Sequence, residues 1–209
     1  MKYQKILLQQ LGHLPYFDKG AICQLSEQYG LKKTTVDAYI SRSLKRRELL
    51  ALRNGLYVTK EFYDKNKNDI SYLFYLANIL RTPSYVSSWT ALQYYNLATE
   101  AIYGVTSVTT RVTRDYTTKA GNFRYQSMKN GLFTDFNLQK GTFDFFIASP
   151  SKALFDMLYF KTNQFRGLSI KDIEIIIEEL RIDFDEMAKS EQKKFYKTLK
   201  HFLSGVNKL

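Results

Sequence analysis

A run of six polar residues, Asp64-Lys65-Asn66-Lys67-Asn68-Asp69, separates Phe62-Tyr63 from an apolar segment that begins at Ile70. Aspartate and asparagine favour turns, so the run is typical of a linker. It predicts two domains, residues 1–63 and residues 70–209. A chain of 209 residues is long enough for each domain to bury a hydrophobic core.

The first domain contains signals for three helices. Apolar residues at helical spacing near the N-terminus predict a helix that ends near Gly12. Asp18 is placed to cap a second helix, and Gly30 is placed to end it. The sequence Thr34-Thr35-Val36-Asp37 has the form of a capping box, which predicts a third helix that runs to about Arg47.

A β-hairpin is expected to follow these helices. Residues 49–52 and 56–58 have the composition of short strands, and Asn54-Gly55 between them is a strong signal for a tight turn. Arg53 would lie at the tip of this hairpin. Three helices followed by a hairpin with a basic tip is the element order of a winged helix-turn-helix domain, which binds DNA.

The third helix is amphipathic. At about 100° per residue its apolar side chains fall on one side and its small, hydroxylic and basic side chains fall on the other. The apolar side consists of Val36, Tyr39, Ile40 and Leu44. The polar side is narrow enough to enter a DNA major groove about 12 Å wide. We expect the groove to be faced by Thr34, Thr35, Ala38, Ser41 and Arg42, and phosphates to be neutralised by Lys32, Lys33, Lys45, Arg46 and Arg53.

The charge of the chain favours a polyanionic partner. There are 31 Lys and Arg against 20 Asp and Glu, a net charge of +11, and residues 1–60 alone hold 11 against 4, a net charge of +7. Basic proteins bind nucleic acids largely by neutralising phosphates and releasing their counterions. Three amphipathic helices and a hairpin can also bind another protein, so a protein-docking role for this domain stays open.

The second domain is expected to mix helices and strands. Residues 70–80 predict a buried helix, and Ser88 is placed to cap a short aromatic helix. From Gly104 the apolar period changes to two, which predicts a sheet. Its expected strands are residues 105–112, 123–128, 132–136 and 143–147, and Ser149 and Ser169 are each placed to cap one of the helices that follow. The predicted fold class is therefore α+β: a winged helix-turn-helix, then a mixed α+β domain with a mostly antiparallel sheet and C-terminal helices.

A second basic patch falls within the region of this sheet. It contains five cations against the single carboxylate of Asp115, and its members are Arg111, Arg114, Lys119, Arg124 and Lys129. Three interpretations stay open: a further DNA contact, a docking surface for an acidic protein, or an ordinary solvated face of the sheet.

The residue inventory excludes several function classes. Cys23 is the only cysteine, so no intramolecular disulfide can form, and His13 and His201 lie far apart with no zinc-binding motif near either. We therefore expect no metal, no cofactor and no catalytic residues. The longest apolar run, residues 70–80, has about half the length of a membrane-spanning helix, and no secretory signal is evident. These features lead us to expect a cytoplasmic protein without a membrane partner.

Three segments carry a resemblance to a known family. They are Tyr85-Val86-Ser87-Ser88-Trp89-Thr90-Ala91-Leu92, Val108-Thr109-Thr110-Arg111 and Ala148-Ser149-Pro150-Ser151-Lys152-Ala153-Leu154-Phe155-Asp156. With the N-terminal domain, they resemble the AbiEi family of antitoxins over nearly the whole chain. The family usually has Glu at the position of Ser151, so no acidic role is carried over to that residue.

The resemblance implies an antitoxin of a type IV toxin-antitoxin system, which acts in abortive phage infection. Such an antitoxin represses its own operon by binding inverted repeats in double-stranded operator DNA, and it counteracts a nucleotidyltransferase-like toxin. A non-catalytic, DNA-binding regulator is therefore our leading expectation.

Two other functions stay open. One is a metal-dependent nuclease with a winged-helix targeting domain, in which Asp135, Asp144 and Lys152 would surround a divalent ion. The other is a purely protein-binding inhibitor whose winged helix does not contact DNA. No phosphate-binding glycine loop or activated nucleophile pair supports a transferase.

Overall fold

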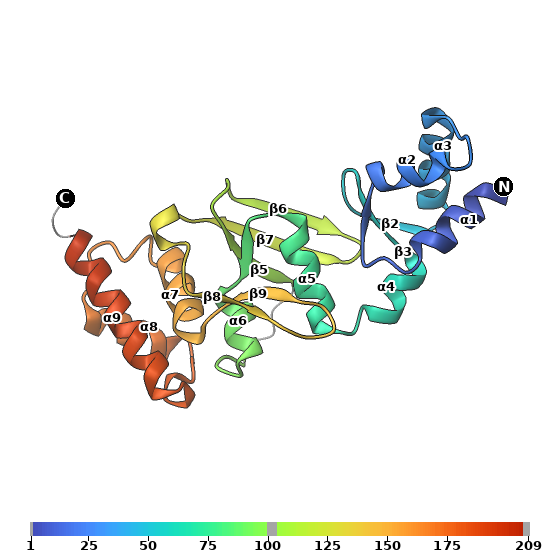
Figure 1. Cartoon of the computed structure of the whole chain (residues 1–209). Helices are drawn as coiled ribbons and strands as arrows, with labels where there is room; N and C mark the ends of the chain where they lie inside the picture. Colours follow the sequence, from blue (N-terminus) through green and yellow to red (C-terminus); the bar gives the residue numbers. More distant parts are fainter. Residues whose placement is uncertain (1, 100–103, 207–209) are drawn as a thin grey trace. The chain divides into compact units, whose positions relative to one another are not determined.

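Contacts along the chain divide it into two units (Figure 1). The structure, a computed structural model, describes residues 2–99 and 104–206. The first unit comprises Met1–Leu73 together with Tyr116–Asn122, and the second comprises Phe74–Asp115 and Phe123–Leu209. Both units combine helices with strands, which confirms the predicted α+β class.

The first unit packs helices against a small antiparallel sheet of order β1-β3-β2. Its elements are α1 (Lys2–Leu11), β1 (Phe17–Asp18), α2 (Lys19–Glu27), α3 (Lys33–Lys45), β2 (Leu49–Arg53), β3 (Leu56–Thr59) and α4 (Lys60–Asn66). Side chains from the first three helices and all three strands form one buried cluster, which consists of Leu11, Phe17, Ile22, Val36, Ile40, Leu49 and Tyr57. The unit therefore has a hydrophobic core of its own.

Several predicted starts and turns of this unit are confirmed. The Asp18 carboxylate caps α2 by accepting a hydrogen bond of 2.7 Å from the Ala21 N–H. Gly30 follows α2 with a φ of +64°, and Gly55 forms the β2–β3 turn with a φ of +77°. A residue without a Cβ adopts these left-handed conformations at little cost, so glycine suits both positions.

The predicted capping box at Thr34-Thr35-Val36-Asp37 is wrong. The N-cap position of α3 is Lys32, no side chain caps the helix, and Thr34 lies inside its first turn. The Asp37 carboxylate instead forms an ion pair of 2.6 Å with the Lys19 ammonium of α2. The Asp37 carboxylate, which the local pattern assigned to a capping box, therefore binds a tertiary partner instead.

Part of the predicted linker is helical. Residues 64–66 are the last residues of α4, which Thr59 caps by accepting from the Phe62 N–H at 3.2 Å. Lys60 pairs with Asp64, and Lys65 pairs with Glu61, each at the helical spacing of four residues. A solvated helix surface and a linker are both rich in polar residues. Composition alone therefore did not distinguish the helix from a linker.

The second unit is built on a six-stranded sheet of order β6-β7-β5-β4-β9-β8. Its strands are β4 (Ser84–Val86), β5 (Val105–Thr109), β6 (Arg114–Thr118), β7 (Gly121–Ser127), β8 (Phe136–Gln139) and β9 (Phe145–Ala148). Its helices are α5 (Ile70–Leu80), α6 (Ser88–Tyr94), α7 (Pro150–Lys161), α8 (Ile170–Glu179) and α9 (Lys189–Val206), with short 3-10 turns at Asn130–Leu132 and Phe184–Glu186. The residues from Tyr116 to Asn122, at the β6–β7 turn, are grouped with the first unit.

The prediction of a mostly antiparallel sheet needs correction. β4 pairs antiparallel with β5, and β8 pairs antiparallel with β9, but β4–β9 and β5–β7 are parallel. The sheet is therefore mixed. A period of two identifies strands but carries no information on the direction of their partners.

α7 lies at the centre of the second unit. Its residues 151–159 are all buried, and it packs against α6, α9 and β9. Ser149 caps it as predicted, and Ser169 forms a capping box with Asp172 at the start of α8. The predicted cap at Ser88 is wrong, because Ser87 holds the N-cap position of α6 and its hydroxyl is used elsewhere.

No helix in the part of the chain that the structure describes combines the length and the apolar character needed to cross a membrane.

Candidate nucleic-acid interface

The buried side of α3 fixes which of its side chains reach solvent. Val36 and Ile40 are 1% and 7% exposed and lie in the core of the first unit. Ser43 also faces inward, and its hydroxyl accepts a hydrogen bond of 2.8 Å from Gln4 Nε2 of α1. Because both polar groups are buried, this bond restricts rotation of α3 against α1. The opposite face of α3 therefore stays on the surface.

That exposed face carries the residues expected to meet DNA. Arg42 lies on it with its guanidinium carbon 5.5 Å from the centre of the Tyr39 ring, a cation–π contact that restrains the side chain. Thr35 and Ala38 are half-buried at the edge of the face. The exposed members are Lys32, Lys33, Thr34, Ser41, Arg42, Lys45 and Arg46.

The cations of this face, and Arg53 on the β2–β3 hairpin, are not neutralised by the protein. Across residues 2–99 and 104–206, no carboxylate forms an ion pair with Lys32, Lys33, Arg42, Lys45, Arg46 or Arg53. Six unpaired charges on one small unit repel one another. Such a surface favours a partner that supplies negative charge.

The β2–β3 hairpin presents the sixth of these cations. Arg53 is exposed beside the Asn54-Gly55 turn, where the register between β2 and β3 shifts. The Gly55 carbonyl accepts a hydrogen bond of 3.1 Å from the Lys19 N–H, at the first residue of α2. The hairpin tip is thus attached to the helical part of the unit.

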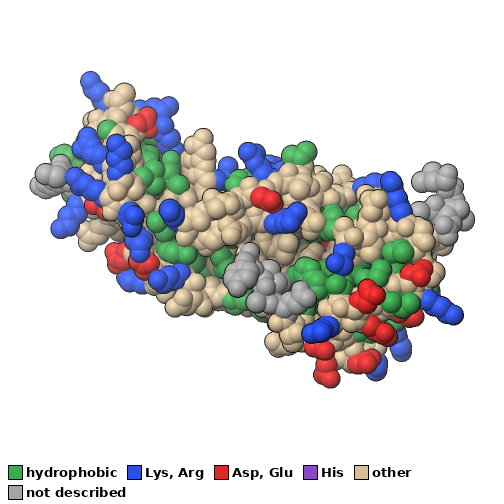
Figure 2. Space-filling model, turned by 180° about the vertical axis from the view of Figure 1, so that it is seen from behind, with side chains coloured by type: hydrophobic (Ala, Val, Ile, Leu, Met, Phe, Trp, Pro, Cys, Tyr) green, Lys and Arg blue, Asp and Glu red, His purple; other side chains and the backbone are tan. Residues whose placement is uncertain are grey.

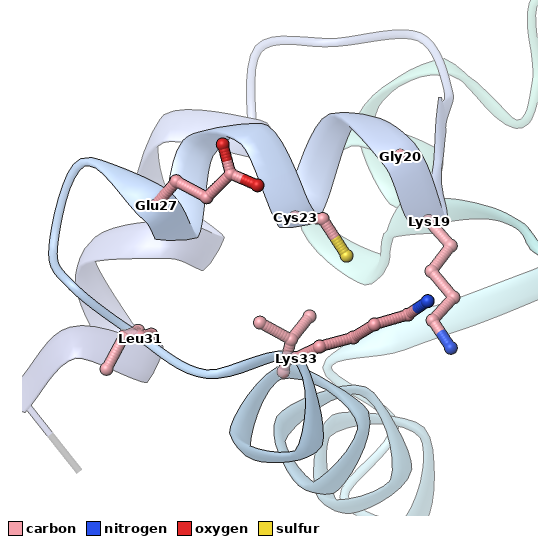
Figure 3. A pocket seen from close by; sticks show the side chains of 7 residues that line it. Lys19, Gly20, Cys23, Glu27, Leu31 and Lys33 are labelled. Carbon is pink, nitrogen blue, oxygen red and sulfur yellow. The ribbon is translucent and has the colours of Figure 1, made fainter.

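A pocket of about 400 Å³ lies between α2 and the first turn of α3 (Figure 3). Figure 3 shows the side chains of Lys19 and Lys33 at one end of it and the carboxylate of Glu27 toward the other. Cys23 lines the pocket between them. The hydrogen bond to Asp37 raises the pKa of Lys19, so this ammonium stays charged, and its pairing holds α2 against α3.

The sequence interpretation did not include Lys19 among the site residues. Lys19 is the first residue of α2, and only the packing of α2 against α3 brings its ammonium to Asp37, so its place in the sequence gives no signal for this site. The pocket itself depends on how α2 and α3 pack, and no local pattern indicates it.

Charge is distributed unevenly over the surface. Figure 2 shows Lys and Arg side chains gathered over the first unit and Asp and Glu side chains gathered over the part that carries α8 and α9. The acidic group lines a pocket that includes Glu174, Glu178, Asp183, Asp185 and Glu186. Residues 170–206, which include α8 and α9, hold 7 Lys and Arg against 8 Asp and Glu, so the net charge of +11 comes from the rest of the chain.

All five residues of the second basic patch are exposed. Arg111, Arg114, Arg124 and Lys129 belong to the second unit, whereas Lys119 lies at the β6–β7 turn that is grouped with the first. Asp115 approaches Arg124 at 3.9 Å, too far for a strong hydrogen-bonded pair.

The three residues of the nuclease alternative have separate partners. Asp135 pairs with Lys194 at 2.9 Å, Asp144 pairs with Lys140 at 2.5 Å, and Lys152 pairs with Asp156 at 2.7 Å. Among the described residues no group of three His, Cys, Asp or Glu side chains could hold a metal ion.

Two of the segments that carry the family resemblance meet in the core of the second unit. Tyr85 and Ser87 donate hydrogen bonds of 3.0 and 2.7 Å to Asp156 Oδ2, and the Lys152 ammonium lies 2.7 Å from Asp156 Oδ1. Ser151 donates from its N–H and its hydroxyl to the Glu191 carboxylate of α9, at 3.0 and 2.6 Å. These motif residues are buried in a structural cluster rather than exposed to a ligand.

In comparisons with known proteins, no family model and no curated protein matches this chain.

Proposed function

We propose that this chain is a non-catalytic regulator that binds double-stranded operator DNA through a winged helix-turn-helix in its first unit. The observation that carries the proposal is the solvent face of α3, which presents hydroxylic side chains and unpaired cations on a helix whose rotation is fixed by its core. In this role α3 enters the major groove, and Arg53 of the hairpin meets the phosphate backbone beside it.

The wider biological role follows from the family resemblance. We propose an AbiEi-like antitoxin of a type IV toxin-antitoxin system that represses its own operon and counteracts a nucleotidyltransferase-like toxin. Growth rescue by this chain, when it is expressed with the product of the neighbouring gene, tests the antitoxin role separately from DNA binding.

The DNA-binding proposal is tested with Arg42→Ala/Lys45→Ala. Both side chains are exposed, so the fold should be retained, as circular dichroism can check. Removal of one base contact and one phosphate contact is expected to weaken binding to the DNA upstream of the gene roughly 10- to 100-fold. The matched control is Lys193→Ala/Lys197→Ala, which removes the same charge from exposed positions on α9.

Gel-shift titrations of the unmodified chain and the two double variants at several salt concentrations test whether α3 is the recognition helix. An Arg42→Ala/Lys45→Ala protein that is folded and binds as tightly as the unmodified chain rules out α3 as the recognition helix. Absence of salt-sensitive DNA binding in the unmodified chain, together with co-purification of the neighbouring gene product, favours the purely protein-binding inhibitor instead.

A further inference from the structure

The loop between β5 and β6 is exposed to solvent and carries an apolar side chain, Val112. Residues 110–114 read Thr-Arg-Val-Thr-Arg. Val112 is 75% exposed, and Arg111 and Arg114 on either side of it are exposed as well. The loop therefore presents the Arg111 guanidinium and a small apolar tip to solvent, and the exposed residue Arg114 follows at the start of β6.

Three hydrogen bonds hold this loop, two through its backbone and one through the Thr113 side chain. The guanidinium of Arg81, a residue only 8% exposed, donates to the Val112 carbonyl. The Thr109 hydroxyl accepts from the Arg111 N–H at 3.2 Å, and the Thr113 hydroxyl accepts from the Ser127 N–H at 3.0 Å. A buried arginine used to fix a surface loop indicates that the loop has a defined shape before any partner binds.

Strand pairing brings Lys129 to this loop, and Asp115, which follows Arg114, lies 3.9 Å from Arg124. β5 and β7 are parallel, with Thr109 opposite Ser127, and the Met128 N–H donates to the Thr109 carbonyl at 2.9 Å. Lys129 therefore emerges next to the loop that follows β5. Arg124 lies on the exposed face of β7, between the buried residues Phe123 and Tyr125.

These four cations account for most of the basic character of their unit. The sequence of the second unit, residues 74–115 and 123–209, contains 17 Lys and Arg against 13 Asp and Glu, a net charge of +4. Arg111, Arg114, Arg124 and Lys129 together with Asp115 carry a net charge of +3, so most of the excess of the unit lies here. We call these four residues the loop patch. Asp115 is the single carboxylate within it, 3.9 Å from Arg124.

We propose that the loop patch is a second nucleic-acid contact, which binds the phosphate backbone of duplex DNA without reading its sequence. Three of its four members are arginines, whose planar guanidinium groups bind phosphate in a bidentate way. A protein partner would require an apolar centre for the interface, and Val112 is the only large apolar side chain exposed on the loop. The inference rests on the proposed DNA-binding function and extends it to a second surface.

The test uses the full chain with Arg111→Ala/Arg114→Ala/Lys129→Ala and measures affinity for two duplexes over a range of salt. One duplex contains the DNA upstream of the gene, and the other has an unrelated sequence. The slope of log affinity against log salt is expected to become less steep by roughly 0.9 for each phosphate that is no longer neutralised, on both duplexes. With three such phosphates, the affinity decrease between 50 and 200 mM salt becomes about 40-fold smaller.

The matched control removes three charges elsewhere in the same unit. Lys193→Ala/Lys197→Ala/Lys200→Ala changes exposed positions of α9 and is expected to leave the slope unchanged. Circular dichroism establishes that both triple variants are folded. An unchanged slope in the loop-patch variant overturns the inference, and so does an equal decrease in the α9 variant, because the effect would then reflect net charge alone.

Failure of the inference and failure of the proposed function give different results. If Arg42→Ala/Lys45→Ala binds both duplexes normally while the loop-patch variant has a less steep slope, recognition by α3 is wrong and the second contact stands. If the double variant binds the upstream DNA weakly while the loop-patch slope is unchanged, recognition by α3 stands and the second contact is wrong.

Discussion

The Asp156 carboxylate is fully enclosed in the second unit, with 0% of its side chain exposed. Burial raises its pKa, while the neighbouring Lys152 ammonium and the hydroxyls of Ser87 and Tyr85 act in the opposite direction by stabilising the charged form. Lys152 is buried as well, and it also donates 2.6 Å to the Leu132 carbonyl. A buried ion can be tolerated when its partner and its hydrogen bonds are in place, so each of these groups depends on the others.

Removal of one partner is therefore expected to cost more than removal of both charges. Lys152→Met leaves an unpaired buried carboxylate and should lower the free energy of unfolding by about 3–5 kcal/mol. Lys152→Met/Asp156→Asn keeps an acceptor for Ser87 and Tyr85 without the unpaired charge, and it should recover a large part of that loss. Urea unfolding followed by tryptophan fluorescence measures both values.

Lys161→Met is the control for this comparison, because Lys161 lies on the same helix but is exposed. It should change the free energy of unfolding by less than about 0.5 kcal/mol. If the double variant is as unstable as Lys152→Met alone, the loss comes from packing of the lysine stem and not from the charge left on Asp156.

At the scale of elements, the sequence correctly predicted the helix starts whose capping hydrogen bonds are made between residues close together in the chain. Asp18, Ser149 and Ser169 cap their helices as expected because each cap is completed within three residues. The predicted caps at Thr34 and Ser88 are wrong, and in both regions a tertiary partner uses the polar group nearby: Lys19 pairs with Asp37, and Asp156 accepts from Ser87.

In the candidate site, too, local features could be predicted from the sequence and tertiary features could not. Helical periodicity was sufficient to predict which side of α3 faces solvent, since the buried face of one helix is a local pattern. The pocket at Lys19 and the closeness of Lys129 to the 110–114 loop depend on helix packing and on parallel strand pairing. Neither can be deduced from the spacing of residues along the chain.

The capping box of α8 gives a prediction at this scale. The Asp172 carboxylate accepts hydrogen bonds of 2.7 Å from both the N–H and the hydroxyl of Ser169, and these bonds lower the pKa of Asp172. A lowered pKa means that the stabilisation is present above the ordinary pKa of an aspartate and is lost as the pH falls through the lower value in the folded state.

Asp172→Ala should therefore be less stable than the unmodified chain at pH 7, and the difference should shrink in acid. Thermal unfolding by circular dichroism across the acid range measures it. Asp183→Ala is the control, since the Asp183 side chain makes no capping hydrogen bond. A difference between Asp172→Ala and the unmodified chain that is constant with pH would show that the carboxylate charge is not responsible.

At the scale of the whole molecule, each unit has the features of a separate cooperative structure. The first unit has its own core around Ile22, Val36 and Ile40, and the second is organised around the buried helix α7. Separate cores allow separate unfolding transitions, since the loss of one need not expose the apolar side chains of the other. Function can then be divided in the same way, with sequence recognition proposed for the first unit and a backbone contact proposed for the second.

Two spectroscopic probes can test this separation because Trp89, in α6, is the only tryptophan of the chain. Its fluorescence reports on the second unit, whereas far-ultraviolet circular dichroism, a signal dominated by helices, reports on both. Leu52 and Leu154 are each 0% exposed, in the first and second units respectively, and replacement of either by alanine should cost about 2–5 kcal/mol.

Leu52→Ala should therefore lower the unfolding midpoint of the part of the circular dichroism signal that comes from the first unit, and leave the fluorescence midpoint unchanged. Leu154→Ala should lower the fluorescence midpoint. The two variants are matched in chemistry and burial, so they differ only in the unit they affect. If Leu52→Ala shifts the fluorescence midpoint as far as Leu154→Ala does, the units unfold as one. A change on the loop patch would then also alter the stability of α3, and DNA-binding effects of the two surfaces could be compared only between variants of equal stability.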